Sequence, residues 1–330
     1  MPPVRIVIVT PALADANNGN WQTARRWARL LGGAYRVRLQ AQWAGGDETL
    51  MIALHARRSA GAIAAWRASP ARRPLVVVLT GTDLYRDIER SAAAQASLAS
   101  ADRLVVLNDL GASALPPGLR AKCRVVLQSC AARPALDKPQ THLRALMVGH
   151  LREEKSPQAY FAAVRRLARR ADIFLDHAGA ALDPDLGAQA RALMLECPRY
   201  DWLGALPHDE ARARIQAAHV LVHTSQMEGG AHVVVEALRS GTPVLASRID
   251  GNVGLLGTDY PGYFPFGDAA ALAAMLERAR DDPAMLAGLR AHCARRAPLF
   301  RPARERCAVR ALVRSLLQPG LPEGDDDGPA

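Results

Sequence analysis

The chain has 330 residues, of which 49% are hydrophobic, and this is enough for two ordinary domains with separate cores. No apolar run reaches the ~18 to 20 residues that a membrane-spanning helix needs. Residues 1–5 lead directly into a predicted strand rather than into a secretory signal. The five cysteines are scattered and lack the close spacing of a zinc or redox motif. We therefore expect a cytoplasmic protein with reduced thiols and no stable membrane insertion.

The formal net charge is +10 at pH 7, and the whole excess lies in the first part of the chain. Residues 1–138 carry 19 lysines and arginines against 9 acidic residues, whereas residues 139–330 carry 23 of each kind. Such a basic region is typical of proteins that bind nucleic acid, a membrane surface or a small anionic substrate. A solvated arginine-rich surface explains the same numbers.

Short apolar runs alternate with longer helical patterns along the chain, which predicts an α/β protein with parallel sheets. The first series of predicted strands covers residues 5–10, 36–40, 75–79, 103–107 and 124–127. The second series covers residues 144–148, 173–178, 200–203, 220–222 and 243–247. Further helices are predicted at residues 269–280, 283–295 and 303–317.

A proline-containing linker separates the two series and predicts a domain boundary near residues 138–143. We expect two doubly wound, Rossmann-like domains over residues 1–138 and 143–295. A C-terminal helix is expected within residues 296–318. The acidic tail, residues 319–330, is expected to be disordered.

Loops at the carboxyl ends of the strands are the places where an open parallel sheet binds ligands. Gly19 and Asn20 follow the first strand in a glycine turn that opens a helix, and they could face a diphosphate or form a simple loop. Asp83 follows a later strand and could reach into a cleft or cap the next helix. Arg152 and Lys155 follow the first strand of the second series and could neutralise a diphosphate or lie on the surface.

Glu228 and Glu236 lie in the most informative segment of the chain. Gly229 and Gly230 allow a tight turn between them, and residues 231–240 form a predicted helix. The free N–H groups at a helix N-terminus bind phosphate, while the two carboxylates accept hydrogen bonds from sugar and ribose hydroxyls. This pattern predicts a nucleotide-sugar site. A core helix or strand with two solvated glutamates is the alternative.

The ordered motifs of residues 144–256 resemble those of the GT-B glycosyltransferases that have a Glu-x7-Glu signature. They are Val148-Gly149, Lys155, Leu203-Gly204, Glu228-Gly229-Gly230 with Glu236-Ala237, and Gly241-Thr-Pro-Val. The resemblance implies two Rossmann-like domains that face a central cleft. Residues 1–138 would then form the acceptor domain, and residues 143–295 would form the nucleotide-sugar donor domain.

The resemblance also implies roles for residues that bind the donor. Lys155 would pair with the diphosphate, and Glu236 would accept hydrogen bonds from the ribose hydroxyls. The family usually has arginine where this chain has His150, so Arg152 could substitute in that phosphate contact.

The resemblance also implies which residues would hold the sugar and the base of the donor. Glu228 would hold the sugar together with the amides of Gly229, Gly230 and Ala231, which also meet the phosphate. The backbone near Leu206 would meet the base.

A closer resemblance covers nearly the whole chain and is to the selenosugar synthases of selenoneine biosynthesis. It rests on residues 18–27, 54–60, 79–85, 226–231 and 251–254 with 259–263. Enzymes of that family join selenophosphate to the sugar of a UDP-sugar and make a carbon–selenium bond. The implied partners are UDP-N-acetylglucosamine or UDP-glucose, and selenophosphate.

The residues fit this chemistry on their own terms. A hydroxyl acceptor needs a general base, whereas selenophosphate is already anionic, so the enzyme mainly has to collect and align two anions. His55, Arg57 and Arg58 are the predicted acceptor-binding residues, with Arg25 and Arg26 behind them, since the arginine fork suits phosphate oxygens. Each of these could instead be a surface charge.

The predicted catalytic residues are Lys155, Arg152, Glu228 and Asp83. Lys155, Arg152 and the helix that begins near Gly229 would stabilise the departing UDP. No metal or cofactor is expected, because the Asp183-Pro-Asp185 run and the acidic tail are more simply explained as solvated.

Three alternatives remain open. A lipid-linked acceptor would suit residues 21–31, a basic helix with two tryptophans, although these could also pack against the sheet. A UDP-sugar epimerase of the same fold would need no acceptor. A nucleic-acid-binding protein is disfavoured by the aromatic content of 5% and by the lack of a known binding module, so no nucleic-acid partner is expected.

Overall fold

The computed structural model describes residues 4–13 and 19–318. Contacts divide the chain into two units, residues 1–129 with 301–330 and residues 130–300. The second unit begins earlier than the predicted boundary because the linker bonds to it, as where Arg133 N donates to the Arg239 carbonyl at 2.9 Å. The predicted disordered tail and residues 14–18 of the first glycine loop lie outside the described residues.

The sheet of the first unit has six parallel strands in the order β2-β1-β3-β4-β5-β6. They are β1 (Arg5–Val9), β2 (Arg36–Gln40), β3 (Leu50–Leu54), β4 (Leu75–Val78), β5 (Arg103–Val106) and β6 (Cys123–Val125). The sequence patterns did not predict β3, although it is central. Its short run of Leu, Met, Ile and Ala is equally compatible with a buried helix, so periodicity does not distinguish the two.

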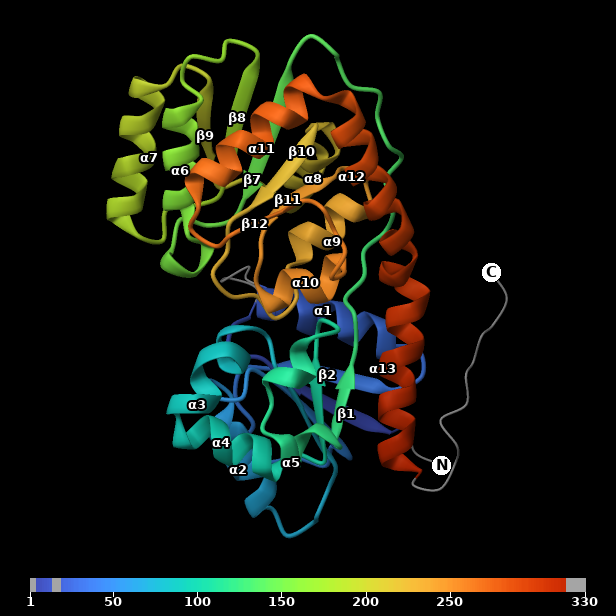
Figure 1. Cartoon of the computed structure of the whole chain (residues 1–330). Coiled ribbons are helices and arrows are strands. Elements are labelled where there is room, and N and C mark those ends of the chain that lie inside the picture. Colours follow the sequence, from blue (N-terminus) through green and yellow to red (C-terminus); the bar gives the residue numbers. More distant parts are fainter. Residues whose placement is uncertain (1–3, 14–18, 319–330) are drawn as a thin grey trace. The chain divides into compact units, whose positions relative to one another are not determined.

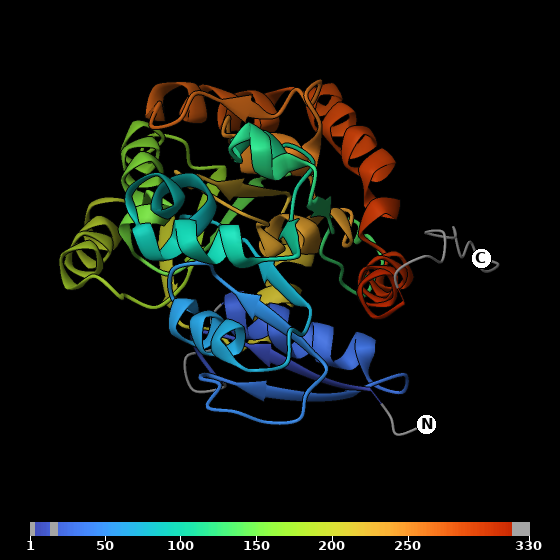
Figure 2. The ribbon, with the colours of Figure 1, turned by 90° about the horizontal axis from the view of Figure 1, so that it is seen from below.

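Helices cover both faces of this sheet (Figures 1 and 2). One face carries α1 (Gly19–Leu31) and α13 (Pro302–Leu317), which contact each other. The other carries α2 (Ala60–Ala68) and α4 (Ala92–Ser100). Two short helices, α3 (Ile88–Arg90) and α5 (Pro117–Arg120), lie in the connections. The last helix therefore belongs to the first unit.

A buried carboxylate joins α13 to α1. Glu305 accepts hydrogen bonds from Arg26 Nε at 2.9 Å, from Trp27 Nε1 at 2.9 Å and from the Ser129 hydroxyl at 2.6 Å. Arg26 is thus bound inside the unit rather than held ready for an acceptor. Trp27 is fully buried, which favours packing over membrane contact for this tryptophan of the basic helix.

The sheet of the second unit has six parallel strands in the order β12-β11-β10-β7-β8-β9. They are β7 (Leu143–Val148), β8 (Ile173–Ala178), β9 (Tyr200–Gly204), β10 (Val220–His223), β11 (Val244–Ser247) and β12 (Tyr263–Phe264). The chain starts at β7, winds outward to β9 and then returns to β10 on the other side. The strand order thus reverses between β7 and β10, and such a switch point is where doubly wound sheets bind ligands.

Seven α-helices of the described chain belong to this unit, five between successive strands and the last two after β12 (Figure 1). They are α6 (Pro157–Arg166), α7 (Pro184–Glu196), α8 (His208–Ala217), α9 (His232–Leu238), α10 (Asp250–Leu256), α11 (Ala269–Asp281) and α12 (Pro283–Arg296). Asp183 caps α7 through the amides of Asp185 and Leu186, so the Asp-x-Asp run has a structural role. Among the described residues, no helix combines the length and apolar character that crossing a bilayer requires.

Candidate active site

The switch point of the second sheet brings two loops together. β7 and β10 are paired in parallel, so the loops that follow them leave from the same edge. The Thr224 hydroxyl donates to the Lys155 carbonyl at 2.8 Å, and Gln226 N donates to the Glu154 carbonyl at 3.0 Å. These bonds fix the loop after β10 against the loop after β7.

Lys155 and Glu228 meet at this junction. Lys155 Nζ donates to Glu228 Oε1 at 2.5 Å, and His223 Nε2 lies 3.4 Å from the same oxygen. Burial by itself would raise the pKa of Glu228, but Lys155 and His223 outweigh it and hold the pKa well below its ordinary value. Glu228 is therefore a carboxylate that can accept hydrogen bonds from a sugar, and the Lys155 ammonium group lies beside it.

The loop that contains Glu228 is supported by α10. A Cβ atom at Gly251 would collide with the Glu228 carbonyl, so only glycine lets the two segments approach this closely. The Ser247 hydroxyl donates to the Ser225 carbonyl at 2.6 Å, and Asn252 Nδ2 donates to the Ser247 carbonyl at 2.9 Å. The loop after β11 therefore supports the backbone of the loop that carries Glu228.

His150 stands where the family usually has arginine, and its environment keeps it neutral. Burial, followed by the nearby charges of Arg152 and Lys155, lowers its pKa. Ala180 N donates to His150 Nδ1 at 3.0 Å, so the ring proton sits on Nε2. His150 can therefore offer a phosphate one N–H donor but no charge.

Arg152 is the charged neighbour that was expected to compensate for this difference. Its side chain is 43% exposed, and its Nε lies 3.8 Å from Glu154 Oε2. The guanidinium therefore remains accessible to an anion.

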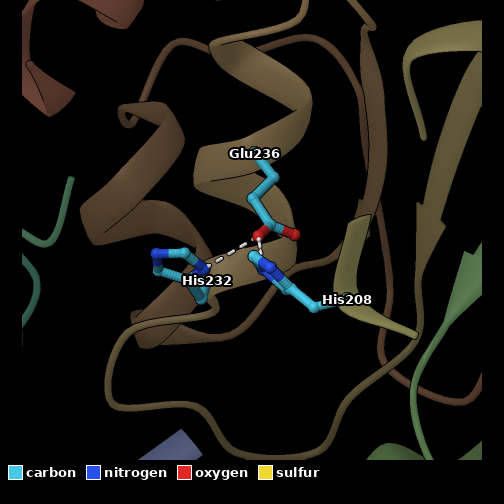
Figure 3. Close-up of side chains that lie close together, drawn as sticks. All are labelled: His208, His232 and Glu236. Carbon is cyan, nitrogen blue, oxygen red and sulfur yellow. Dashed lines mark hydrogen bonds and ion pairs between the residues drawn. The ribbon is translucent and has the colours of Figure 1, made fainter. Parts of the chain in front are cut away.

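Glu236 is buried on α9 and lies between two imidazoles (Figure 3). His208 Nε2 lies 2.7 Å from Glu236 Oε1, and His232 Nδ1 lies 3.2 Å from the same oxygen. Burial would raise the pKa of Glu236, but these two bonds outweigh it and lower the pKa to about 2. Its hydrogen bond to Glu236 is the main cause that raises the pKa of His208.

These three side chains also resemble a metal site. Their ligand atoms lie within 4.8 Å of one another, and two imidazoles with one carboxylate are a donor set that suits Zn²⁺. However, Arg212 Nε lies 3.9 Å from Glu236 Oε1, so a permanent cation already faces the carboxylate and opposes a second one. The arrangement therefore fits a hydrogen-bonded carboxylate better than a resident metal.

Four other predicted donor contacts lie in the same unit. Leu206 is half-buried in the loop between β9 and α8, just before His208. Gly229, Gly230 and Ala231 connect Glu228 to α9, whose first residue is His232. The helix is shorter than the predicted residues 231–240.

Two predicted residues of the first unit form a buried pair. Asp83 is fully buried and accepts hydrogen bonds from the amides of Ala56 at 2.9 Å, Thr80 at 2.8 Å and Gly81 at 2.9 Å. All three amides precede the helical turn that begins at Asp83, so the carboxylate fixes the loop backbone rather than capping a helix, and the proposed catalytic set leaves Asp83 out. His55 is 2% exposed, has a positive φ of 70°, and its Nδ1 lies 3.9 Å from Asp83 Oδ2. A left-handed backbone at a residue other than glycine costs energy, and such strain often occurs at functional sites.

The remaining residues predicted in the first unit are exposed to different degrees. Arg57 Nε donates to Asp87 Oδ2 at 2.7 Å, whereas the exposed Arg58 guanidinium has no polar partner among the described residues. Gly19 and Asn20 form the first turn of α1. The structure therefore brings Lys155, Glu228 and their neighbours together in the second unit. The residues predicted to bind the acceptor, together with Gly19 and Asn20, lie in the first unit.

Three histidines of the second unit, His208, His223 and His232, were not predicted to take part. His232 precedes Glu236 by four positions, and this spacing puts two side chains on one helix face, so it could have been recognised. His208 and His223 belong to other elements, and no local pattern links them to the glutamates.

Two doubly wound parallel sheets are the architecture of the GT-B fold, and the lysine–glutamate pair lies at the switch point of the second. Residues 130–299 match the family model "Glycosyl transferases group 1", and the chain belongs to that family. The predicted fold class and the predicted class of enzyme are thereby confirmed.

Two relatives match parts of the chain. The 2-deoxystreptamine glucosyltransferase of Streptomyces kanamyceticus is 39% identical over 95 residues, which are 28% of this chain and 24% of the relative. The D-inositol 3-phosphate glycosyltransferase of Streptomyces avermitilis is 30% identical over 183 residues, 52% of this chain and 39% of the relative. The matched segments span less than half of either relative.

Solved structures resemble nearly the whole chain. Sucrose-phosphate synthase from Thermosynechococcus elongatus has a TM-score of 0.77 at 18% identity, covering 95% of this chain and 99% of its own. HepE from Anabaena, solved with UDP and glucose, has a TM-score of 0.75 at 16% identity, covering 95% and 100%. At these identities the similarity shows the fold.

Proposed function

We propose that the protein transfers a sugar from a UDP-sugar to selenophosphate and forms a carbon–selenium bond. The observation that carries the donor half is the Lys155–Glu228 pair at the switch point, with buried, ionised Glu236 on the next helix. The complexes of HepE with UDP and with UDP-glucose, on a similar fold, support UDP as the nucleotide. The resemblance to selenosugar synthases supports the acceptor.

In the donor site, each charged group has one task. Glu236 accepts hydrogen bonds from the ribose, and Glu228 accepts them from the sugar. Lys155, with Arg152 and the N–H of His150, binds the diphosphate. The amides of residues 229–231 assist at the phosphate, and the backbone near Leu206 meets the base.

In the reaction step, the anionic selenium attacks the anomeric carbon and forms the new bond. The bond between that carbon and the phosphate oxygen breaks, and its electron pair leaves with UDP. Because no proton has to be removed from the acceptor, the step needs no general base. Lys155 stabilises the negative charge that develops on the leaving diphosphate.

The acceptor side rests on the basic first unit. Arg58 is its best candidate because its guanidinium is exposed and has no polar partner among the described residues. Arg57 shares its charge with Asp87, and buried His55 lies behind them. An arginine fork binds phosphate oxygens in two places, which would orient the selenium of selenophosphate.

A panel of UDP-sugars, each with and without selenophosphate, tests this function. We expect one UDP-sugar, UDP-N-acetylglucosamine or UDP-glucose, to yield UDP and a selenium-containing sugar in equal amounts, identified by mass. Substitution of Glu228 by Gln should abolish both products together. Selenophosphate consumption that is independent of every UDP-sugar would contradict the proposal.

A hydroxyl-bearing acceptor is the second candidate, and the names of the two relatives favour it. The acceptors in those names, 2-deoxystreptamine and D-inositol 3-phosphate, are small molecules with hydroxyl groups. Both compounds and a lipid acceptor on anionic vesicles belong in the same panel. UDP release with one of them, and none with selenophosphate, would make this the preferred function.

A further inference from the structure

We infer that His208 and His232 are positioning residues that hold one oxygen of Glu236, so that its other oxygen is presented to the ribose of the nucleotide. The inference rests on the proposed donor site and adds two residues that do not contact the nucleotide themselves. By orienting Glu236, they make the site prefer a ribonucleotide to a deoxyribonucleotide.

The contacts of the Glu236 carboxylate are one-sided. His208 Nε2, at 2.7 Å, and His232 Nδ1, at 3.2 Å, both meet Oε1, and Figure 3 shows the second oxygen turned away from them. Arg212 Nε, at 3.9 Å, also lies nearest to Oε1. Within the described residues, no hydrogen bond reaches Oε2. One oxygen is thus fully engaged, and the other remains an unused acceptor.

Two independent elements create this asymmetry. His232 lies one turn before Glu236 on α9, and a pair on one helix can still rotate together. His208 is the first residue of α8 and approaches from 28 residues away in the sequence. Two donors from different directions fix the plane of the carboxylate as well as its position. Glu236 keeps only 3% of its surface exposed, so a ligand meets it in one orientation.

The charge state makes Oε2 a selective acceptor. A carboxylate that remains ionised accepts hydrogen bonds and donates none, so it pairs with hydroxyl groups rather than with phosphate oxygens. Because Glu236 is ionised, both imidazoles must offer it an N–H. A ribose hydroxyl supplies the hydrogen-bond donor that Oε2 lacks. A deoxyribose has no hydroxyl group at that carbon, so the bound ligand would cover Oε2 without giving it a hydrogen bond.

A double-mutant-type cycle, in which the histidines and the ribose hydroxyls are removed separately and together, tests the inference. Binding of UDP and of 2′,3′-dideoxy-UDP is measured by calorimetry with the wild type and with His208→Ala/His232→Ala. We expect the wild type to prefer UDP by roughly 10- to 100-fold, because hydrogen bonds to a charged acceptor are lost with the hydroxyls. The double variant should bind dideoxy-UDP normally and lose most of the preference.

Conservative variants and a control complete the test. Gln at position 208 and Asn at position 232 place an amide N–H near the positions of Nε2 and Nδ1, so His208→Gln/His232→Asn should restore the preference. His292→Ala on α12 removes a histidine elsewhere in the unit and should change neither affinity.

The outcomes separate the inference from the proposed function. If the double variant loses affinity for UDP and dideoxy-UDP equally, the histidines do not position Glu236 for the ribose, and the inference is wrong. If the wild type binds UDP without preferring it to dideoxy-UDP, the ribose role of Glu236 is wrong as well. If it binds no UDP at millimolar concentration, the donor site itself is contradicted.

Discussion

Lys155 and Glu228 neutralise each other before any ligand arrives. Their side chains are 17% and 12% exposed, so the pair lies in a setting where charges interact more strongly than in water. In the proposed donor site, a diphosphate would have to share or replace the contact of Lys155 with Glu228, and this would free Glu228 for the sugar. The pair would then couple the binding of the leaving group to the binding of the sugar.

Substitution of Lys155 by Ala should lower turnover by ~100-fold, because a charge that stabilises the leaving diphosphate is lost. The same change leaves Glu228 without its cation and should lower thermal stability. The double variant Lys155→Ala/Glu228→Gln should recover stability without recovering turnover. Initial rates and melting curves measure both effects, and a rate within about threefold of wild type would contradict the role of Lys155.

At the scale of residues, local patterns predicted the central groups of the site and missed their partners. Glu228 and Glu236 could be found because a glycine turn and a helix start stand between them in the sequence. Lys155 could be found because it follows a predicted strand. His208 could not, since its contact with Glu236 joins residues 28 positions apart and exists only in the folded sheet.

At the scale of elements, His177 on β8 holds the loop that begins the proposed donor site. It is fully buried, and its Nε2 lies 3.0 Å from the Gly149 carbonyl. Burial lowers its pKa from 6.5 to about 4. The neutral ring is thus required by the fold.

This environment predicts a loss of stability in acid. As pH falls from 6.5 towards 4, the unfolded chain takes up a proton at His177 before the folded chain does, so the free energy of unfolding decreases. The contribution should reach about 3 kcal/mol near pH 4. Urea unfolding at several pH values measures it, and His177→Gln should flatten this part of the profile. Identical pH profiles for the two proteins would contradict the assignment.

The Glu305 contacts predict that α13 depends on one buried carboxylate. Glu305→Ala should lower the free energy of unfolding of the first unit by about 3 to 5 kcal/mol, because it leaves the Arg26 cation buried without its partner. Arg306→Ala, an exposed change on the same helix, is the matched control. Denaturant unfolding compares them, and equal losses would show that Glu305 does not anchor the helix.

The elements themselves were predicted unevenly. Most strands lie within one or two residues of the expected ranges, because apolar runs between helical patterns are a strong local signal. β3 was missed, since its composition suits a helix as well as a strand. α13 was expected near its observed position, but its place in the first unit depends on a contact between residues 279 positions apart.

For the whole molecule, the positive charge and the proposed donor site belong to different parts of the chain. The excess of +10 lies in residues 1–138, whereas the lysine–glutamate pair lies in the second unit. This division predicts that acceptor binding and donor binding can be impaired separately. Counting the charged residues along the sequence revealed this division. The count could not identify which arginines already pair with a carboxylate in the folded chain.

Arg58→Ala should raise the apparent KM for selenophosphate by roughly 10-fold or more while UDP affinity stays within about twofold, because a phosphate contact is lost in the first unit only. Arg57→Ala should have a smaller effect, since Arg57 already pairs with Asp87. Arg169→Ala, an exposed change in the second unit, is the control. Loss of UDP affinity with an unchanged KM would contradict the assignment of the acceptor site.

The location of bound UDP tests the central claim most directly. In a crystal structure of the protein with UDP, we predict that the ribose hydroxyls lie within hydrogen-bonding distance of Glu236 and that Lys155 Nζ contacts the diphosphate. The nucleotide should therefore lie at the switch point between β7 and β10. A nucleotide bound in the first unit, for example at the start of α1, or the absence of UDP at millimolar concentration would contradict the account.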